Sequence, residues 1–199
     1  MTLKISLILA HPNPASFNHA IARAARQTLQ HHGHQVCWHD LYAEGFDPLL
    51  PAEEFEREAP LPGVLQGYCR EISQADGLVI VHPNWWGQPP AILKGWIDRV
   101  LRPGVAYQFL DGDDGEGVPV GLLRARTALV FNTSNTPRPR ELAVFGDPLE
   151  TIWKNCILGL CGVSNFFRKN FEVVVTSTPA HRAEWLTEVQ EIVVRHFPG

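Results

Sequence analysis

The stretch GLVIVHP at residues 77–83 constrains the fold more than any other part of the chain. Its apolar side chains occupy consecutive positions, so both faces of the strand that it predicts must be covered. A strand of this kind lies in the middle of a parallel sheet, with helices packed on either side. The sequence therefore predicts an α/β fold built around this segment.

Strand and helix patterns alternate along the rest of the chain. Further strands are predicted at 3–9, 35–41, 127–134 and 171–177, a short extended segment at 105–109, and helices at 17–32, 64–75, 91–101, 147–160 and 179–197. This alternation predicts one domain over residues 1–199, a doubly wound five-stranded parallel sheet with helices on both faces. In such sheets a ligand binds at the carboxyl ends of the strands, so the loops that follow the first, third and fourth strands are the candidate binding loops.

Composition narrows the classes of partner. The formal net charge is −4 and charged residues make up 19% of the chain, which gives no electrostatic case for nucleic acid. No apolar stretch approaches the ~18 residues that a membrane span needs, and the amino-terminal segment is predicted to be a strand, not a signal peptide. The cysteines lack CxxC spacing and predict reduced thiols in a cytoplasmic protein; they are Cys37, Cys69, Cys156 and Cys161.

The first candidate loop is AHPNPASFN at 10–18, which leads into a helix. Ser16 or Asn18 can cap that helix, whose first N–H groups and positive dipole end form an anion site suited to phosphate. His11 adds a ring donor. The glycine-rich patterns GxGxxG and GxxxxGK[ST] are absent, so neither common nucleotide loop applies. The plainer alternative is that Ser16 only caps the helix and His11 is an ordinary loop residue.

The second loop, HPNWWGQPP, places Trp85 beside Trp86 directly after the buried strand. Consecutive side chains of an extended chain point in opposite directions, so at least one of the two borders a cleft or a partner surface. Gly87 lets the backbone approach a ligand closely. This combination suits a planar heteroaromatic ligand, and the alternative is a tryptophan pair in the core or in an interface.

The third loop, NTSNTP, is polar where a strand has just ended. Its side chains can hydrogen-bond the polar edge of a planar ring. Ordinary turn chemistry is the alternative.

Two further patterns imitate metal sites. HHGH at 31–34 closes a helix, where histidines near the negative dipole end and a capping glycine need no metal. DGDDGEG at 111–117 places its glycine at the fifth position, not the sixth that a calcium loop requires, and is expected to be an exposed acidic turn. The sequence therefore predicts no metal site.

Taken together, HPNPASFNHAI and HPNWWGQPPAILKGWIDRVLRPGVAYQF resemble the flavodoxin-like NAD(P)H:quinone reductase family, the DT-diaphorase-like enzymes and their shorter bacterial relatives. The resemblance spans nearly the whole chain. It implies a homodimeric flavoprotein that takes hydride from NAD(P)H and passes two electrons to a quinone-like acceptor. It favours FAD as the cofactor, with FMN as the alternative. Two other functions stay open: a flavin-binding regulatory subunit of another protein such as a transporter, and a small electron carrier.

The resemblance also assigns residues. It implies a flavin phosphate loop at His11, Ser16, Phe17 and Asn18. It implies a border of the isoalloxazine ring at Pro83, Asn84, Trp85, Trp86 and Gly87. Where relatives have a Thr-Thr-Gly-Gly loop on the pyrimidine edge, this chain has Asn132, Thr133, Ser134 and Asn135. Tyr107 and Phe109 match aromatic residues that reach the partner subunit's substrate pocket.

One departure concerns charge near the flavin. Phe145 stands where mammalian-type members have a His, and Pro139 or a neighbour stands where they have a Tyr; neither side chain donates a proton. A cation can stabilise the same charge, and Arg138 and Arg140 are candidates, unless they are solvated loop charges. Arg182 is a candidate for an adenosine phosphate, with a plain surface arginine as the alternative.

Overall fold

In this computed structural model, which describes residues 1–56, 59–110 and 117–199, five parallel strands form one sheet in the order β2-β1-β3-β6-β7. The strands are β1 (Lys4–Leu9), β2 (Gln35–Asp40), β3 (Gly77–Pro83), β6 (Thr127–Thr133) and β7 (Asn165–Phe171). The segment 77–83 is the central strand and is buried at every position, which confirms the predicted flavodoxin-like arrangement.

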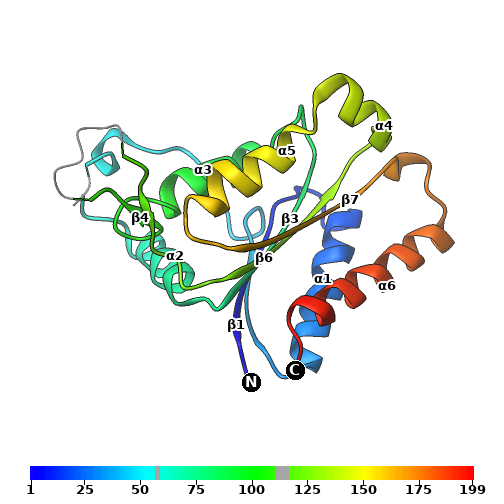
Figure 1. The fold of residues 1–199 in the computed structure, drawn as a ribbon, viewed down its shortest axis with the longest axis horizontal. Coiled ribbons are helices and arrows are strands. Elements are labelled where there is room, and N and C mark those ends of the chain that lie inside the picture. Colours follow the sequence, from blue (N-terminus) through cyan, green and yellow to red (C-terminus); the bar gives the residue numbers. More distant parts are fainter. Residues whose placement is uncertain (57–58, 111–116) are drawn as a thin grey trace.

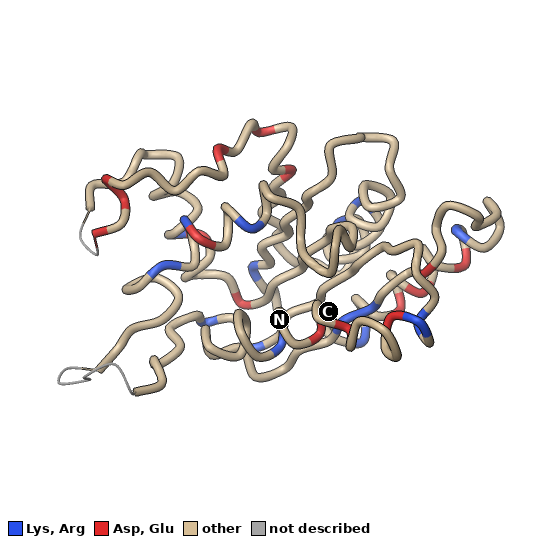
Figure 2. The backbone as a smooth tube through the Cα atoms, turned by 90° about the horizontal axis from the view of Figure 1, so that it is seen from above, with Lys and Arg blue, Asp and Glu red and all other residues tan. Residues whose placement is uncertain are grey.

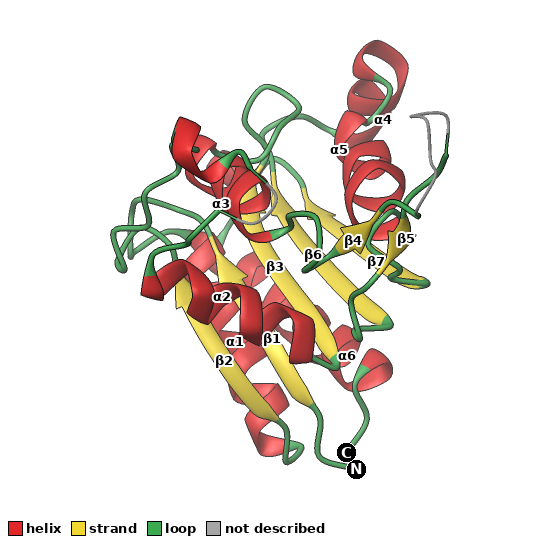
Figure 3. Cartoon of the chain, turned by 90° about the vertical axis from the view of Figure 1, so that its left-hand side faces the viewer, coloured by secondary structure: helices red, strands yellow, loops and turns green. Residues whose placement is uncertain are grey.

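Helices cover both faces of the sheet (Figures 1 and 3). α1 (Phe17–His31) and α6 (Pro179–His196) pack against one face. α2 (Gly63–Gln74), α3 (Ala91–Val100) and α5 (Pro148–Thr151) pack against the other. Each helix layer contributes its apolar stripe to a separate hydrophobic core, and β3 lies between the two cores.

Short elements complete the chain. β4 (Tyr107–Gln108) and β5 (Val120–Gly121) form a two-stranded antiparallel ribbon, so the extended segment predicted at 105–109 is confirmed at its centre. α4 (Arg138–Arg140) continues into a wide helical turn, η2 (Glu141–Phe145). The helix predicted at 147–160 is α5 followed by a second wide turn, η3 (Ile152–Gly159). Two 3-10 turns are η1 (Ala52–Glu54) and η4 (Val174–Thr176).

The prediction of the last strand is wrong. The apolar run at 171–177 predicts a strand, but the strand is β7, and part of the run forms η4 after Val173, whose φ is +53°. Among the described strands, β7 pairs with β6 alone and forms the edge of the sheet. Its charged side chains are satisfied by ion pairs, Arg168 with Asp147 and Lys169 with Glu188. Hydrophobic periodicity cannot detect a strand that is stabilised in this way.

The amino and carboxyl termini lie beside each other at the amino ends of the strands (Figures 1 and 3). His34, from the HHGH segment, links them: its Nδ1 accepts from the Leu3 N–H at 3.3 Å and its Nε2 lies 3.0 Å from the Phe197 carbonyl oxygen. Acidic and basic residues are interspersed along the chain in Figure 2. Of the acidic segment discussed above, residues 111–116 lie outside the described residues. In the described chain no helix is long and apolar enough to cross a membrane.

Candidate functional site

Two neighbouring cavities open at the carboxyl ends of β1, β3 and β6. The narrow cavity measures about 240 Å³ and is lined by His11, Ser16, Phe17, Asn18, Pro83, Asn84, Trp85, Thr133, Ser134, Asn135, Val174 and Val175. The wide cavity measures about 580 Å³ and is lined by Asn84, Trp86, Gly87, Ser134, Asn135, Thr136, Glu141, Val144, Phe145 and Pro148. Asn84, Ser134 and Asn135 line both, so we treat the two cavities as one cradle. The three candidate loops therefore meet at one place, and each of their predicted site residues except Asn132 lines the cradle.

The start of α1 forms one end of the cradle. The Ser16 hydroxyl accepts from the His19 N–H at 3.3 Å, which confirms Ser16 as the cap. Asn18 is instead buried, and its Nδ2 donates to the Thr133 hydroxyl at 2.8 Å. Within the described residues, the Asn18 Oδ1 and the N–H groups of Phe17 and Asn18 have no hydrogen-bond partner. Backbone donors at a helix start are suited to an anion.

The twin tryptophans sit on a tight turn. Trp85 and Gln88 exchange backbone hydrogen bonds of 3.1 and 3.0 Å, and the two residues between them have positive φ, +58° at Trp86 and +71° at Gly87, as in a type I′ turn. Glycine is required here because a Cβ on Gly87 would lie 2.7 Å from Pro148 Cγ. The turn leaves Trp86 fully exposed in a backbone conformation that is unfavourable for a tryptophan.

Asn84 braces this turn. Its Oδ1 accepts from the Gly87 N–H at 2.9 Å, and its Nδ2 donates to Glu141 Oε1 at 3.3 Å. Glu141 lies in the wide cavity, although no sequence pattern singles it out. The only signal is a single carboxylate at the start of the apolar run ELAVF in a candidate loop.

Asn132 lies behind the cradle, fully buried, in a hydrogen-bond network that the sequence does not reveal. His82 donates from Nδ1 to the Pro83 carbonyl at 2.8 Å. Its Nε2 accepts from Asn132 Nδ2 at 2.8 Å and from Trp153 Nε1 at 2.9 Å. These contacts require a neutral ring. Burial and, to a smaller extent, the charge of Arg168 together lower the pKa of His82 to about 4, although the hydrogen bond to the Pro83 carbonyl opposes them. The network holds the backbone at the point where the cradle wall begins.

Arg168 is the buried cation nearest to this network. Its guanidinium donates to Asn132 Oδ1 at 3.1 Å and pairs with Asp147 and with Glu150, the latter at 2.9 Å. Asp147 stands at the N-cap position of α5, where a side-chain capping bond is expected. Its carboxylate binds Arg168 instead and makes no capping hydrogen bond to α5. The sequence did not reveal Arg168 because the last strand was predicted at 171–177, beyond this residue, whereas β7 spans Asn165–Phe171.

Other predicted residues lie outside the cradle. Arg138 and Arg140 are exposed on α4 and line neither cavity, and the Arg140 guanidinium lies 6.0 Å from the Phe145 ring. Tyr107 and Phe109 also line neither cavity; their rings meet edge-on at 6.0 Å, and Phe109 is 40% exposed. Arg182 donates to the Ser177 carbonyl and hydroxyl at 2.6 and 3.0 Å.

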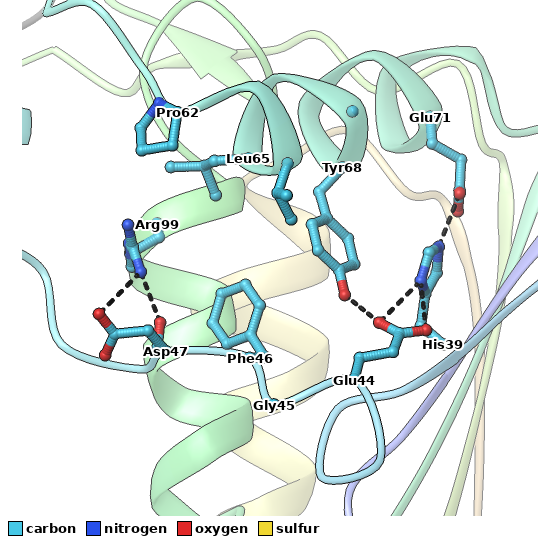
Figure 4. Close-up of a pocket in the computed structure, with 12 residues that line it drawn as sticks. His39, Glu44, Gly45, Phe46, Asp47, Pro62, Leu65, Tyr68, Glu71 and Arg99 are labelled. Atoms are coloured by element: carbon cyan, nitrogen blue, oxygen red, sulfur yellow. Dashed lines mark hydrogen bonds and ion pairs between the residues drawn. The ribbon is translucent and has the colours of Figure 1, made fainter.

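A larger cavity, of about 730 Å³, lies elsewhere, between α2 and the loop after β2 (Figure 4). The Tyr68 hydroxyl donates to Glu44, and His39 bridges two carboxylates, Glu44 at 3.1 Å and Glu71 at 2.6 Å. Burial alone would lower the pKa of His39, but hydrogen bonds to these carboxylates and their charge raise it to about 9. We call this the His39 cavity; its polar side chains are engaged with one another.

The chain matches known proteins over most of its length. Residues 3–192 match the family model described as the flavodoxin-like fold. An uncharacterized NAD(P)H oxidoreductase of Haemophilus influenzae is 37% identical over 164 residues, which cover 80% of this chain and 78% of that protein.

Two further relatives are named quinone reductases. The NAD(P)H dehydrogenase [quinone] 1 of Rattus norvegicus is 33% identical over 178 residues, or 78% of this chain and 64% of the rat protein. The solved structure of an NAD(P)H:quinone oxidoreductase from Methanothermobacter marburgensis superposes with a TM-score of 0.83 at 25% identity, covering 97% of this chain and 96% of that one. The fold, the converging loops and these similarities agree, and the chain belongs to the flavodoxin-like NAD(P)H:quinone oxidoreductase family.

Proposed function

We propose that this protein is a flavin-dependent oxidoreductase that transfers a hydride from NAD(P)H, by way of a bound flavin, to a quinone or a related electrophile. The observation that carries the proposal is the cradle. Three loops from three adjacent strands enclose two joined cavities at the carboxyl edge of the sheet, where α/β folds of this topology bind ligands.

The residues present fit a flavin nucleotide. In the narrow cavity, the N–H groups of Phe17 and Asn18 and the ring of His11 are donors for phosphate oxygens. The wide cavity offers polar groups from Asn84, Ser134 and Asn135 beside apolar surface from Trp86, Phe145 and Pro148, which suits a ring with one polar edge. We propose FAD, with FMN as the alternative.

The flavin, when bound, supplies the hydride chemistry; the chain supplies position and electrostatics. The neutral His82 holds the Pro83 carbonyl, and Asn84 holds the tight turn, so the wall against the ring is rigid before any ligand enters. A rigid wall keeps reacting atoms aligned and excludes water. Arg138 and Arg140 are the candidates for stabilising negative charge on the ring. Their side chains must turn toward the wide cavity to do so.

We propose a cytoplasmic homodimer. Tyr107 and Phe109 lie outside their own chain's cradle, with Phe109 partly exposed, so they are placed to serve a second copy. The described cysteines are all free, as expected in a reducing compartment. A heterodimer test checks the arrangement: mixing an inactive cradle variant with a Tyr107→Ala, Phe109→Ala variant restores activity at one of the two sites of a mixed dimer. Failure of every mixture to recover activity would contradict it.

The decisive experiment is a visible spectrum of the purified protein, followed by titration with NAD(P)H and a quinone. We expect a yellow protein, reduced by NAD(P)H and reoxidised by the quinone over many turnovers. Chromatography of the acid-released cofactor distinguishes FAD from FMN. Bound flavin with negligible turnover would instead favour a regulatory subunit, and one-electron reduction alone would favour an electron carrier. A protein that neither contains nor binds flavin would refute the proposal.

A further inference from the structure

Glu141 is a buried carboxylate that faces the wide cavity. Its residue is 5% exposed, at the start of η2. The Asn84 amide donates to Oε1 at 3.3 Å, a long hydrogen bond. Across the described residues, Oε2 has no hydrogen-bond partner and the carboxylate forms no ion pair. Glu141 therefore lines a ligand cavity with unused acceptor capacity.

Burial makes that unused capacity costly. A carboxylate accepts about four hydrogen bonds, and removing it from water without donors is unfavourable. Asp147, nearby in the chain, shows the usual solution, because Arg168 neutralises it in an ion pair. Among the described residues Glu141 has no such partner, so a donor that enters the cavity would find an acceptor largely removed from bulk water and held in place by Asn84.

The chemistry of a flavin ring supplies one such donor. The pyrimidine edge presents a single N–H between two carbonyl groups. A carboxylate attracts the N–H and repels the carbonyl oxygens, whereas the second hydrogen of the Asn84 amide and the side chains of Ser134 and Asn135 can donate to carbonyls. This donor and acceptor order is complementary to the polar edge of the ring.

We propose that Glu141 accepts a hydrogen bond from the imide N–H of the bound flavin, and that the same carboxylate positions Asn84 beside the adjacent carbonyl group. Glu141 is then a specificity-determining residue for the ring. The proposal rests on the proposed function, since it presumes that the cradle holds a flavin. It adds that this chain uses a negative charge at the polar edge of the ring.

Flavin binding tests this directly. Apo-protein is titrated with FMN and with N3-methyl-FMN, in which the N–H is replaced, and quenching of flavin fluorescence gives each Kd. We expect the wild type to bind FMN at least tenfold more tightly than the methylated probe. Glu141→Met should lose about ten- to hundredfold in FMN affinity and discriminate between the probes by less than about threefold. Glu141→Gln keeps an acceptor of the same shape, so its FMN affinity and its discrimination between the probes should lie between those of the wild type and Glu141→Met.

Glu150→Met is the matched control, because Glu150 is a carboxylate of the same region that pairs with Arg168 and does not line the cradle. It should retain the wild-type discrimination. If Glu141→Met binds both probes more weakly by the same factor, Glu141 only braces Asn84 and the inference falls. If the wild type binds FMN without discrimination, the inference falls and the proposed function stands. If the wild type binds FAD and neither probe, the same titration is made with FAD and N3-methyl-FAD; if it binds no flavin, the proposed function itself fails.

Discussion

The His39 cavity and the cradle differ in how their polar groups are used. In the His39 cavity, of about 730 Å³, the side chains of Tyr68, Glu44, His39 and Glu71 form a chain of mutual contacts. In the cradle, the Asn18 Oδ1 lacks a partner, and Glu141 has a single long one. A cavity whose polar groups satisfy one another stabilises the fold, whereas a cavity lined by buried groups that lack partners offers those groups to a ligand.

Two histidines, His39 at the His39 cavity and His82 behind the cradle, show the same contrast. Two carboxylates make His39 a cation with a pKa of about 9, while burial next to a backbone carbonyl and two donors keeps His82 neutral, with a pKa of about 4. The charge of His39 stabilises the fold through its ion pairs with Glu44 and Glu71. His82 must be uncharged to accept the two hydrogen bonds that hold the cradle wall. We therefore expect substitutions at the His39 cavity to change the free energy of unfolding but not flavin affinity, and substitutions in the cradle to change flavin affinity.

The largest effect is expected at the buried ion pair beside the His39 cavity. Arg99 contacts both oxygens of Glu54 at 2.6 and 3.0 Å, and both side chains are buried. Glu54→Leu leaves Arg99 buried without its main partner, so the free energy of unfolding should fall by about 3–5 kcal/mol in urea titrations. Flavin affinity of the folded protein should stay within about twofold.

Asp98→Asn is the control for that variant. Lys94 and Asp98 form an exposed pair one helical turn apart, at 2.5 Å, and its loss should cost only about 0.3–0.5 kcal/mol. A large loss of flavin affinity in Glu54→Leu would show that the two regions are coupled and would break the comparison.

The pH dependence of stability is the second test. The pKa of His39 is about 9 in the folded protein, against the ordinary value of 6.5 expected in the unfolded chain. The folded state therefore holds this proton more tightly, and the stabilisation is complete below pH 6.5 and disappears as the pH rises through about 9. After solvent screening we expect about 1–2 kcal/mol, measured by urea unfolding at pH 6 and pH 9.5.

His39→Gln should remove most of that alkaline loss. His82 acts in the opposite direction: with its pKa lowered to about 4, the protein should lose stability as the pH falls below 6.5, since the unfolded chain takes up the proton first. An alkaline loss that persists undiminished in His39→Gln would assign it to other groups.

The third test compares two helix caps. Ser16 caps α1 at the cradle and Thr178 caps α6, each by accepting from a backbone N–H three residues on. Ser16→Ala and Thr178→Ala should each cost about 1 kcal/mol in unfolding free energy. Flavin affinity, followed by fluorescence quenching, should fall only for Ser16→Ala. Equal flavin affinity in both variants would make Ser16 a plain cap.

The smallest effect is expected at Trp86. Asparagine tolerates the left-handed backbone better than tryptophan does, and the exposed ring loses no packing when removed. Trp86→Asn should therefore raise the free energy of unfolding of the ligand-free protein by about 0.5–1 kcal/mol while weakening flavin or quinone binding. A destabilised variant would show that the ring packs against something in the folded protein.

Much of this molecule could be predicted from sequence. Four of the strands and the long helices agree with their predicted ranges to within about two residues, because each has an apolar periodicity of its own. The convergence of three loops followed from strand order in doubly wound sheets. β7 was missed because its polar side chains are satisfied by Asp147, Glu150 and Glu188, none of which is near it in the chain.

The sequence by itself determined the layers of the fold and which loops reach the carboxyl edge of the sheet, since both depend on local pattern and general rules of connection. Only the tertiary structure decided which polar side chains within those loops remain free. Asn18 meets Thr133 across 115 residues, and Glu141 meets Asn84 across 57. Whether a buried polar atom finds a partner depends on contacts between distant segments, and that is why Asn132 lies behind the cradle and Glu141 lies within it.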